Sequence, residues 1–136
     1  MAANNTPIFP LTPGVQYGIL GPTQNTDKFG LGTVVTVATG QTSGTRVDYL
    51  RVRATGTNTA TVLRVFINNG SANSVTANNT LFTEATIAST TLSEVAALAE
   101  TTIQLDLALP YLYKINCTIG TAISATLAVS AVLGDY

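Results

Sequence analysis

The chain has 136 residues, of which 10 % are charged, and its formal net charge is −1. A globular domain usually has about 25 % charged residues, so Thr, Ser and Asn must cover most of the wet surface, or an assembly must bury it. Six basic residues give no concentrated positive surface for nucleic acid. No stretch predicts a signal peptide or a membrane-spanning segment.

The sequence contains no histidine, which removes the commonest general base and the commonest metal ligand. The seven carboxylates are scattered, and no glycine-rich phosphate loop precedes a helical pattern. We therefore expect no catalytic residues, no metal site, no cofactor and no enzymatic activity. The single cysteine, Cys117, lies in an apolar pattern and is predicted to be a small buried residue, not a reactive thiol.

Residues 1–30 contain four of the five prolines. Proline fixes φ and removes a hydrogen-bond donor, so we expect an extended N-terminal arm, within which the pattern is compatible with a short strand at Val15–Leu20. The arm is more apolar than a free tail, so it either folds back over its own sheet or reaches a neighbouring subunit. The candidate interface residues are Pro7, Ile8, Phe9, Pro10, Leu11 and Tyr17, with Tyr136 as an anchor at the other end of the chain.

Residues 31–136 predict a sandwich domain of short strands separated by turn residues. In the strand at 46–54, alternation places Leu50, Val52 and Ala54 on one face. The expected strands in this half of the chain are Thr33–Ala38, Arg46–Ala54, Thr59–Asn68 and Thr80–Ser89, the last with Leu81, Ala85 and Ile87 facing inward.

The last third alternates most clearly, which indicates strands at 103–109, 111–119 and 123–133, interrupted by Pro110 and Gly120. Between the two sets of strands, residues 90–100 are compatible with one or two helical turns, but we favour a loop. Tyr111 and Tyr113 share a predicted strand face with apolar residues, so core or interface is favoured over a sugar-binding platform.

Seven or eight short strands predict an all-β fold, a two-sheet antiparallel sandwich of the jelly-roll or a related Greek-key type, with the extended N-terminal arm. An immunoglobulin-like sandwich is the alternative, although the chain has no Trp for its Cys–Trp–Cys signature. The basic residues concentrate in the predicted strands, where we expect cross-strand ion pairs and keep an anion site as the alternative. These residues are Arg46, Arg51, Arg53 and Arg64.

Short phrases between Arg46 and Tyr136 resemble small structural proteins of tailed bacteriophages. The matching phrases are residues 51–58 (RVRATGTN), 63–70 (LRVFINNG), 105–110 (LDLALP) and 134–136 (GDY). The general resemblance extends over about two thirds of the chain and includes no catalytic motif.

The resemblance implies a structural virion protein, most similar to a capsid decoration (cement) protein. Such a protein would be made in the host cytoplasm and lie on the capsid surface of the virion. Its implied partners are the major capsid protein and further copies of itself, as a trimer or dimer, with no nucleic acid and no membrane. Two alternatives remain open: a carbohydrate- or receptor-binding β-sandwich module, and a tail or head–tail connector component.

Overall fold

The structure is a computed structural model and describes residues 9–136. Its regular elements are eight β-strands and one turn of 3-10 helix, η1 (Thr76–Asn78). The strands are β1 (Thr12–Leu20), β2 (Val35–Thr39), β3 (Thr45–Ala54), β4 (Thr61–Asn68), β5 (Asn79–Ile87), β6 (Glu100–Leu109), β7 (Lys114–Ile119) and β8 (Leu127–Asp135).

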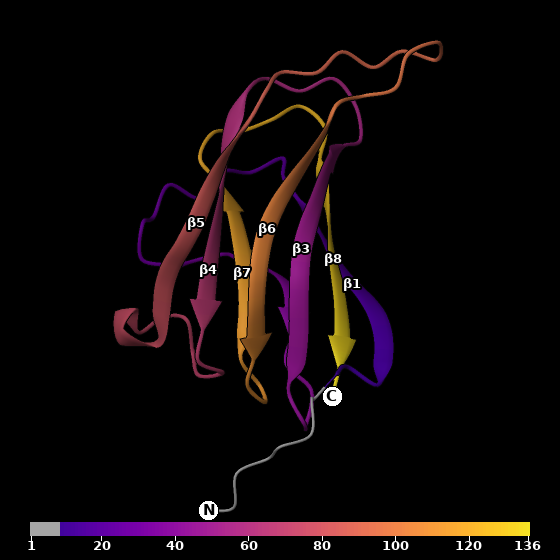
Figure 1. Ribbon diagram of the computed structural model, residues 1–136. Helices are drawn as coiled ribbons and strands as arrows, with labels where there is room; N and C mark the ends of the chain where they lie inside the picture. Colours follow the sequence, from indigo (N-terminus) through magenta and orange to yellow (C-terminus); the bar gives the residue numbers. More distant parts are fainter. Residues whose placement is uncertain (1–8) are drawn as a thin grey trace, which may run out of the picture.

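The strands form two four-stranded antiparallel sheets that pack against each other (Figure 1). Sheet A has the order β1-β8-β3-β6, and sheet B has the order β2-β7-β4-β5. Thus β1 pairs with β8, β2 with β7, β3 with β6 and β4 with β5, as if one long hairpin had been folded into two layers. This is a jelly-roll sandwich, which confirms the predicted fold class over the immunoglobulin-like alternative.

The hydrophobic core lies between the two sheets and is built from alternate residues of the strands. Leu50 and Val52 of β3 are buried there beside Val129 and Ala131 of β8. Register pairs Leu50 with Ala131 and Val52 with Val129, so these side chains enter the core side by side. The predicted alternation in the strand at 46–54 is therefore confirmed.

Part of the proline-rich N-terminal stretch is a strand of the sandwich. Residues 12–20 form β1, an edge strand of sheet A that pairs with β8 along its whole length. The short strand that the pattern allowed at Val15–Leu20 is present and begins three residues earlier. The sandwich thus extends N-terminal to residue 31, where we expected it to begin.

A β-bulge changes which side chains of β5 face the core. Val65 pairs with Thr83, but the next residue, Phe66, pairs with Leu81, which leaves Phe82 as an extra residue. The bulge reverses the alternation, so Leu81 lies on the outer face of sheet B beside Phe66 and is exposed. The prediction that Leu81 faces inward is therefore wrong, whereas Ile87 is buried as expected.

The strand predicted from residue 111 begins three residues later. Residues 110–113 form a turn in which the N–H of Tyr113 donates to the carbonyl of Pro110 at 3.1 Å, and Leu112 has a φ of 68°. Tyr111 is exposed and Tyr113 packs against the core. The prediction of a shared strand face for these two tyrosines is therefore wrong.

The connection from β5 to β6 is a long loop, as favoured from the sequence. It projects away from the end of the sandwich (Figure 1), and the side chain of Val95 in it is 97 % exposed. Near its start, Thr90 forms an isolated bridge with Asn58, which ties this end of the loop to the β3–β4 turn.

Candidate protein-interaction surface

The outer face of edge strand β1 carries a row of exposed apolar residues. Leu11, just before the strand, is 82 % exposed, and Val15, Tyr17 and Ile19 are 63, 71 and 50 % exposed. Val15, Tyr17 and Ile19 alternate along β1 and therefore project from one face of the strand. Together with Leu11 we call them the apolar stripe. Exposed contiguous apolar residues are typical of interaction sites.

The inner face of β1 carries small and polar residues because β1 lies close to β2. A Cβ atom on Gly18 would lie 2.6 Å from Cγ1 of Val35, so no larger residue fits there without a shift. The side-chain amide of Gln16 forms two hydrogen bonds with the backbone of Thr39: Nε2 donates to its carbonyl at 3.2 Å, and Oε1 accepts from its N–H at 3.0 Å. Most of the large side chains of β1 consequently face outward.

A shallow groove of about 480 Å³ runs beside the apolar stripe on the outer face of sheet A. Val15 forms one wall, and Arg51 and Arg53 of β3 with Glu100 of β6 form the other. The floor consists of small β8 residues, Ala128, Ser130 and Val132. A groove with one apolar and one charged wall suits an extended segment of another protein better than a small apolar ligand.

The charged wall is a cluster of cross-strand ion pairs in which two arginines share one carboxylate. Glu100 accepts from Nε and Nη2 of Arg51 at 2.9 and 2.7 Å, and from Nη2 of Arg53 at 3.1 Å. The hydrogen bonds and charge of Arg51 lower the pKa of Glu100, and the same contact raises the pKa of Arg51. The predicted cross-strand pairing is thus confirmed for these two arginines.

The other two basic residues of the cluster predicted from sequence also have carboxylate partners. Nε of Arg46 lies 3.2 Å from Asp48, and its Nη2 lies 3.6 Å from Asp106. On the other sheet, Nε of Arg64 donates to Glu84 at 3.2 Å. All of these pairs have exposed or half-exposed partners, so each contributes little to stability.

The structure brings several candidate interface residues together near one end of β1. Phe9 and Pro10 are exposed beside Leu11, whose N–H donates to the carbonyl of Asp135 at 2.7 Å. Tyr136 follows on β8 at the same end, but it is half-buried, and its N–H donates to the carbonyl of Gly44 at 3.1 Å. Pro7 and Ile8 lie outside the described residues.

Tyr17 lies farther along β1, and two of its neighbours were not among the residues chosen from the sequence. Val15 and Ile19 share its outward face. The glycines at positions 14 and 18 indicate in the sequence that the opposite face of the strand is the closely packed one. Alternating apolar residues ordinarily indicate the side of a strand that faces the core. A strand whose apolar residues face outward is therefore easily assigned the wrong orientation.

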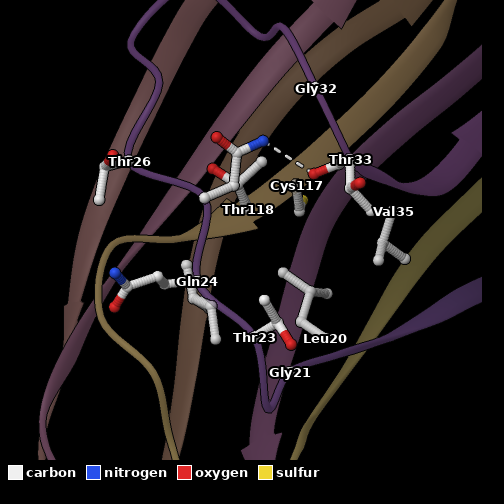
Figure 2. Close-up of a pocket in the computed structure, with 12 residues that line it drawn as sticks. Leu20, Gly21, Thr23, Gln24, Thr26, Gly32, Thr33, Val35, Cys117 and Thr118 are labelled. Carbon is white, nitrogen blue, oxygen red and sulfur yellow. Dashed lines mark hydrogen bonds between the residues drawn. The ribbon is translucent and has the colours of Figure 1, made fainter.

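A second hollow, of about 650 Å³, lies between the β1–β2 loop and β7 (Figure 2). Leu20, Val35 and Cys117 line one side of it, and Gln24 and Thr26 of the loop line the other (Figure 2). The loop is fastened to β7 by the N–H of Asn25, which donates to the carbonyl of Ile119 at 2.9 Å. The hydroxyl of Thr118, also on the lining, is buried and has no hydrogen-bond partner among the described residues.

Cys117 is 1 % exposed, and burial raises the pKa of its thiol to about 12. The thiolate is the nucleophilic form, so we expect no reaction with iodoacetamide or a disulfide reagent at pH 8 in the folded protein. Adding denaturant should expose the thiol and give one labelled site per chain. Rapid labelling of native protein, followed by mass spectrometry, would show that the loop over β7 opens readily.

No helix in the described part of the chain is long and apolar enough to cross a membrane. Within residues 9–136, no group of three or more Cys, Asp or Glu side chains is placed to hold a metal ion. By its fold, the chain is a jelly-roll β-sandwich. Comparisons with family models, curated proteins and solved structures find no match for it.

Proposed function

We propose that this chain is a structural protein that binds other protein surfaces, and specifically a capsid decoration (cement) protein of a tailed bacteriophage. The observation that carries the binding role is the apolar stripe on β1, which lies beside a groove whose charged wall consists of ion-paired residues. The finer assignment to a capsid rests on the resemblance of residues 46–136 to phage structural proteins. Its partners are then the major capsid protein and further copies of the chain.

The composition of the surface supports binding by contact area. Burying apolar area is worth about 25 cal/mol per Å², and few ions must lose water when 10 % of residues are charged. The arginines of the groove are already paired with Glu100, so docking there leaves no new charge without a partner. Several such contacts in one oligomer would strengthen attachment by multivalency, by about 10²- to 10⁴-fold.

The test is co-sedimentation of the purified chain with capsid shells assembled without it, followed by cryo-electron microscopy. We expect saturable binding and ordered density across the joints between capsid subunits. Replacing Phe9 and Leu11 with serine should weaken binding at least tenfold, since each buried large apolar side chain contributes about 1.5–3 kcal/mol.

The matched control for this variant is Val95→Ser, which removes an apolar side chain that is even more exposed, from the β5–β6 loop. It should bind like the unchanged protein. Density confined to a tail or a head–tail vertex would replace the decoration role with the connector role. No binding to any shell or tail component would refute the proposal.

A second candidate function, carbohydrate binding, is favoured by the hollow in Figure 2. Its lining is uncharged and combines apolar with hydroxyl and amide groups, including the buried hydroxyl of Thr118, which suits a neutral sugar. Nuclear magnetic resonance titration with neutral monosaccharides tests it. Saturable shifts at this hollow, lost in Thr118→Val, would support sugar binding, and an unchanged spectrum would exclude it for those sugars.

A further inference from the structure

We infer that two copies of this chain associate through their β1 edges, as antiparallel strands that join the two A sheets across a twofold axis. The inference deepens the proposed function, since it names the surface through which copies would assemble. It is tested in solution without any capsid component, so its failure and that of the decoration role are distinguishable.

β1 differs from the other three edge strands of the sandwich. Edge strands expose backbone hydrogen-bonding groups, and proteins protect them with charges, bulges or short length. β2 has five residues and an irregular register, β5 has a bulge and Glu84, and β6 has Glu100 and Asp106. β1 has nine residues, no charge and a continuous register with β8, and proline occurs only near its start.

The backbone groups at odd positions of β1 point away from β8. Just before β8 the carbonyl of Thr126 accepts from the N–H of Thr55, and just after it the N–H of Tyr136 donates to Gly44, so even-numbered residues of β8 point toward β3. Odd-numbered residues of β8 therefore point toward β1, where register matches them with even-numbered residues. The N–H and C=O groups of Val15, Tyr17 and Ile19 consequently face the open edge.

Pro13 fits the same geometry, because it also occupies an odd position and its missing N–H would face that edge. A proline is tolerated where the N–H does not serve the sheet. The open edge therefore offers the N–H groups of Val15, Tyr17 and Ile19 as donors. The residues between them already pair with β8.

β1 is complementary to itself. A twofold axis sets each strand against its own copy, so a charged residue near the axis would meet its own like charge, and β1 has no charged residue. Antiparallel pairing centred near Val15 sets odd positions opposite odd positions, so that Val15 faces its own copy and Tyr17 faces Pro13 of the second copy. Two apolar stripes then lie side by side as one continuous apolar surface.

Edge pairing brings the flanks of the two apolar stripes into contact and leaves their outer surface open. The exposed fractions of the apolar stripe amount to roughly 500 Å² per copy on the usual scale of side-chain areas, of which the dimer covers only the part along the seam. The dimer is therefore held mainly by backbone hydrogen bonds along the edge, as in other cases of strand addition, and the joined stripes remain available to another protein surface.

The experiment measures the mass of the full chain by size-exclusion chromatography with light scattering over a concentration series. We expect twice the 14.1 kDa of one chain. Val15→Lys should weaken the dimer at least tenfold, because two lysines would then face each other across the axis. The control, Val95→Lys, alters an exposed residue far from β1 and should remain dimeric.

A second variant separates edge pairing from packing of the stripes face to face. Val15→Pro keeps an apolar side chain and removes only an N–H that β8 does not use, so the fold should persist while the dimer is lost. Hydrogen exchange of the unchanged protein should show the amides of Val15, Tyr17 and Ile19 protected in the dimer. A monomer at every concentration, or a dimer that survives Val15→Pro with these amides unprotected, would overturn the inference.

Discussion

Replacing Phe66 with alanine should lower the free energy of unfolding by about 3–5 kcal/mol, the range for deleting a buried aromatic ring. Phe66 is fully buried although it projects from the outer face of sheet B, because the β1–β2 loop covers it. A Cβ atom on Gly30 of that loop would lie 3.2 Å from Cδ1 of Phe66, and Gly30 has a φ of 77°, which favours glycine.

Urea unfolding followed by circular dichroism measures this effect, and the neighbouring strand supplies a matched control. Phe82 on β5 is 44 % exposed, so Phe82→Ala makes the same chemical change with an expected loss of about 1 kcal/mol or less. An equal decrease in the free energy of unfolding in the two variants would contradict the assignment of Phe66 to a second, smaller core beneath the β1–β2 loop.

Replacing Asn58 with alanine should cost about 2 kcal/mol, because the N–H of Ala125 would lose its acceptor and the carbonyl of Thr126 would lose one of its donors. Asn58 is 5 % exposed and joins two turns at the same end of the sandwich. Its Oδ1 accepts from the N–H of Ala125 at 2.6 Å, and its Nδ2 donates to the carbonyl of Thr126 at 3.2 Å. Its own backbone pairs with Thr90 of the β5–β6 loop.

Asn58→Asp refines the prediction, since the carboxylate retains the acceptor for Ala125 but loses the donor to Thr126. Thermal unfolding should therefore show a substantially lower stability for both Asn58 variants than for the unchanged protein. The control, Asn69→Ala, removes the side chain of an exposed turn asparagine and should cost clearly less. An Asn58→Ala protein as stable as the unchanged chain would show that the turns hold together without this side chain.

The periodicity of the sequence was sufficient to predict the fold class, because inward residues such as Leu50 and Val52 repeat at every second position. It failed where one extra residue changes the register, as at Phe82, since a bulge leaves no distinctive local signature. It also failed at Leu112, whose positive φ belongs to a turn that an alternating apolar pattern conceals.

The interaction surface was predictable only in part. Leu11 and Tyr17 were chosen because a proline-rich segment with large apolar residues is unlike a free tail, and both are exposed. The orientation of the whole strand depends on the close approach of Gly18 to Val35, a contact between two strands that composition does not reveal. Tyr136 is half-buried, because its backbone continues the pairing of β8 with β3.

The nested strand pairing has a consequence for synthesis of the protein on the ribosome. β8 lies between β1 and β3 in sheet A. The four strands of this sheet therefore cannot all pair until residues 127–135 have been translated, after the other seven strands. Only the β4–β5 hairpin pairs consecutive strands, and it is the natural place for the nascent chain to begin folding. Until β8 emerges, the first strand has no partner in its sheet, and its apolar residues stay exposed.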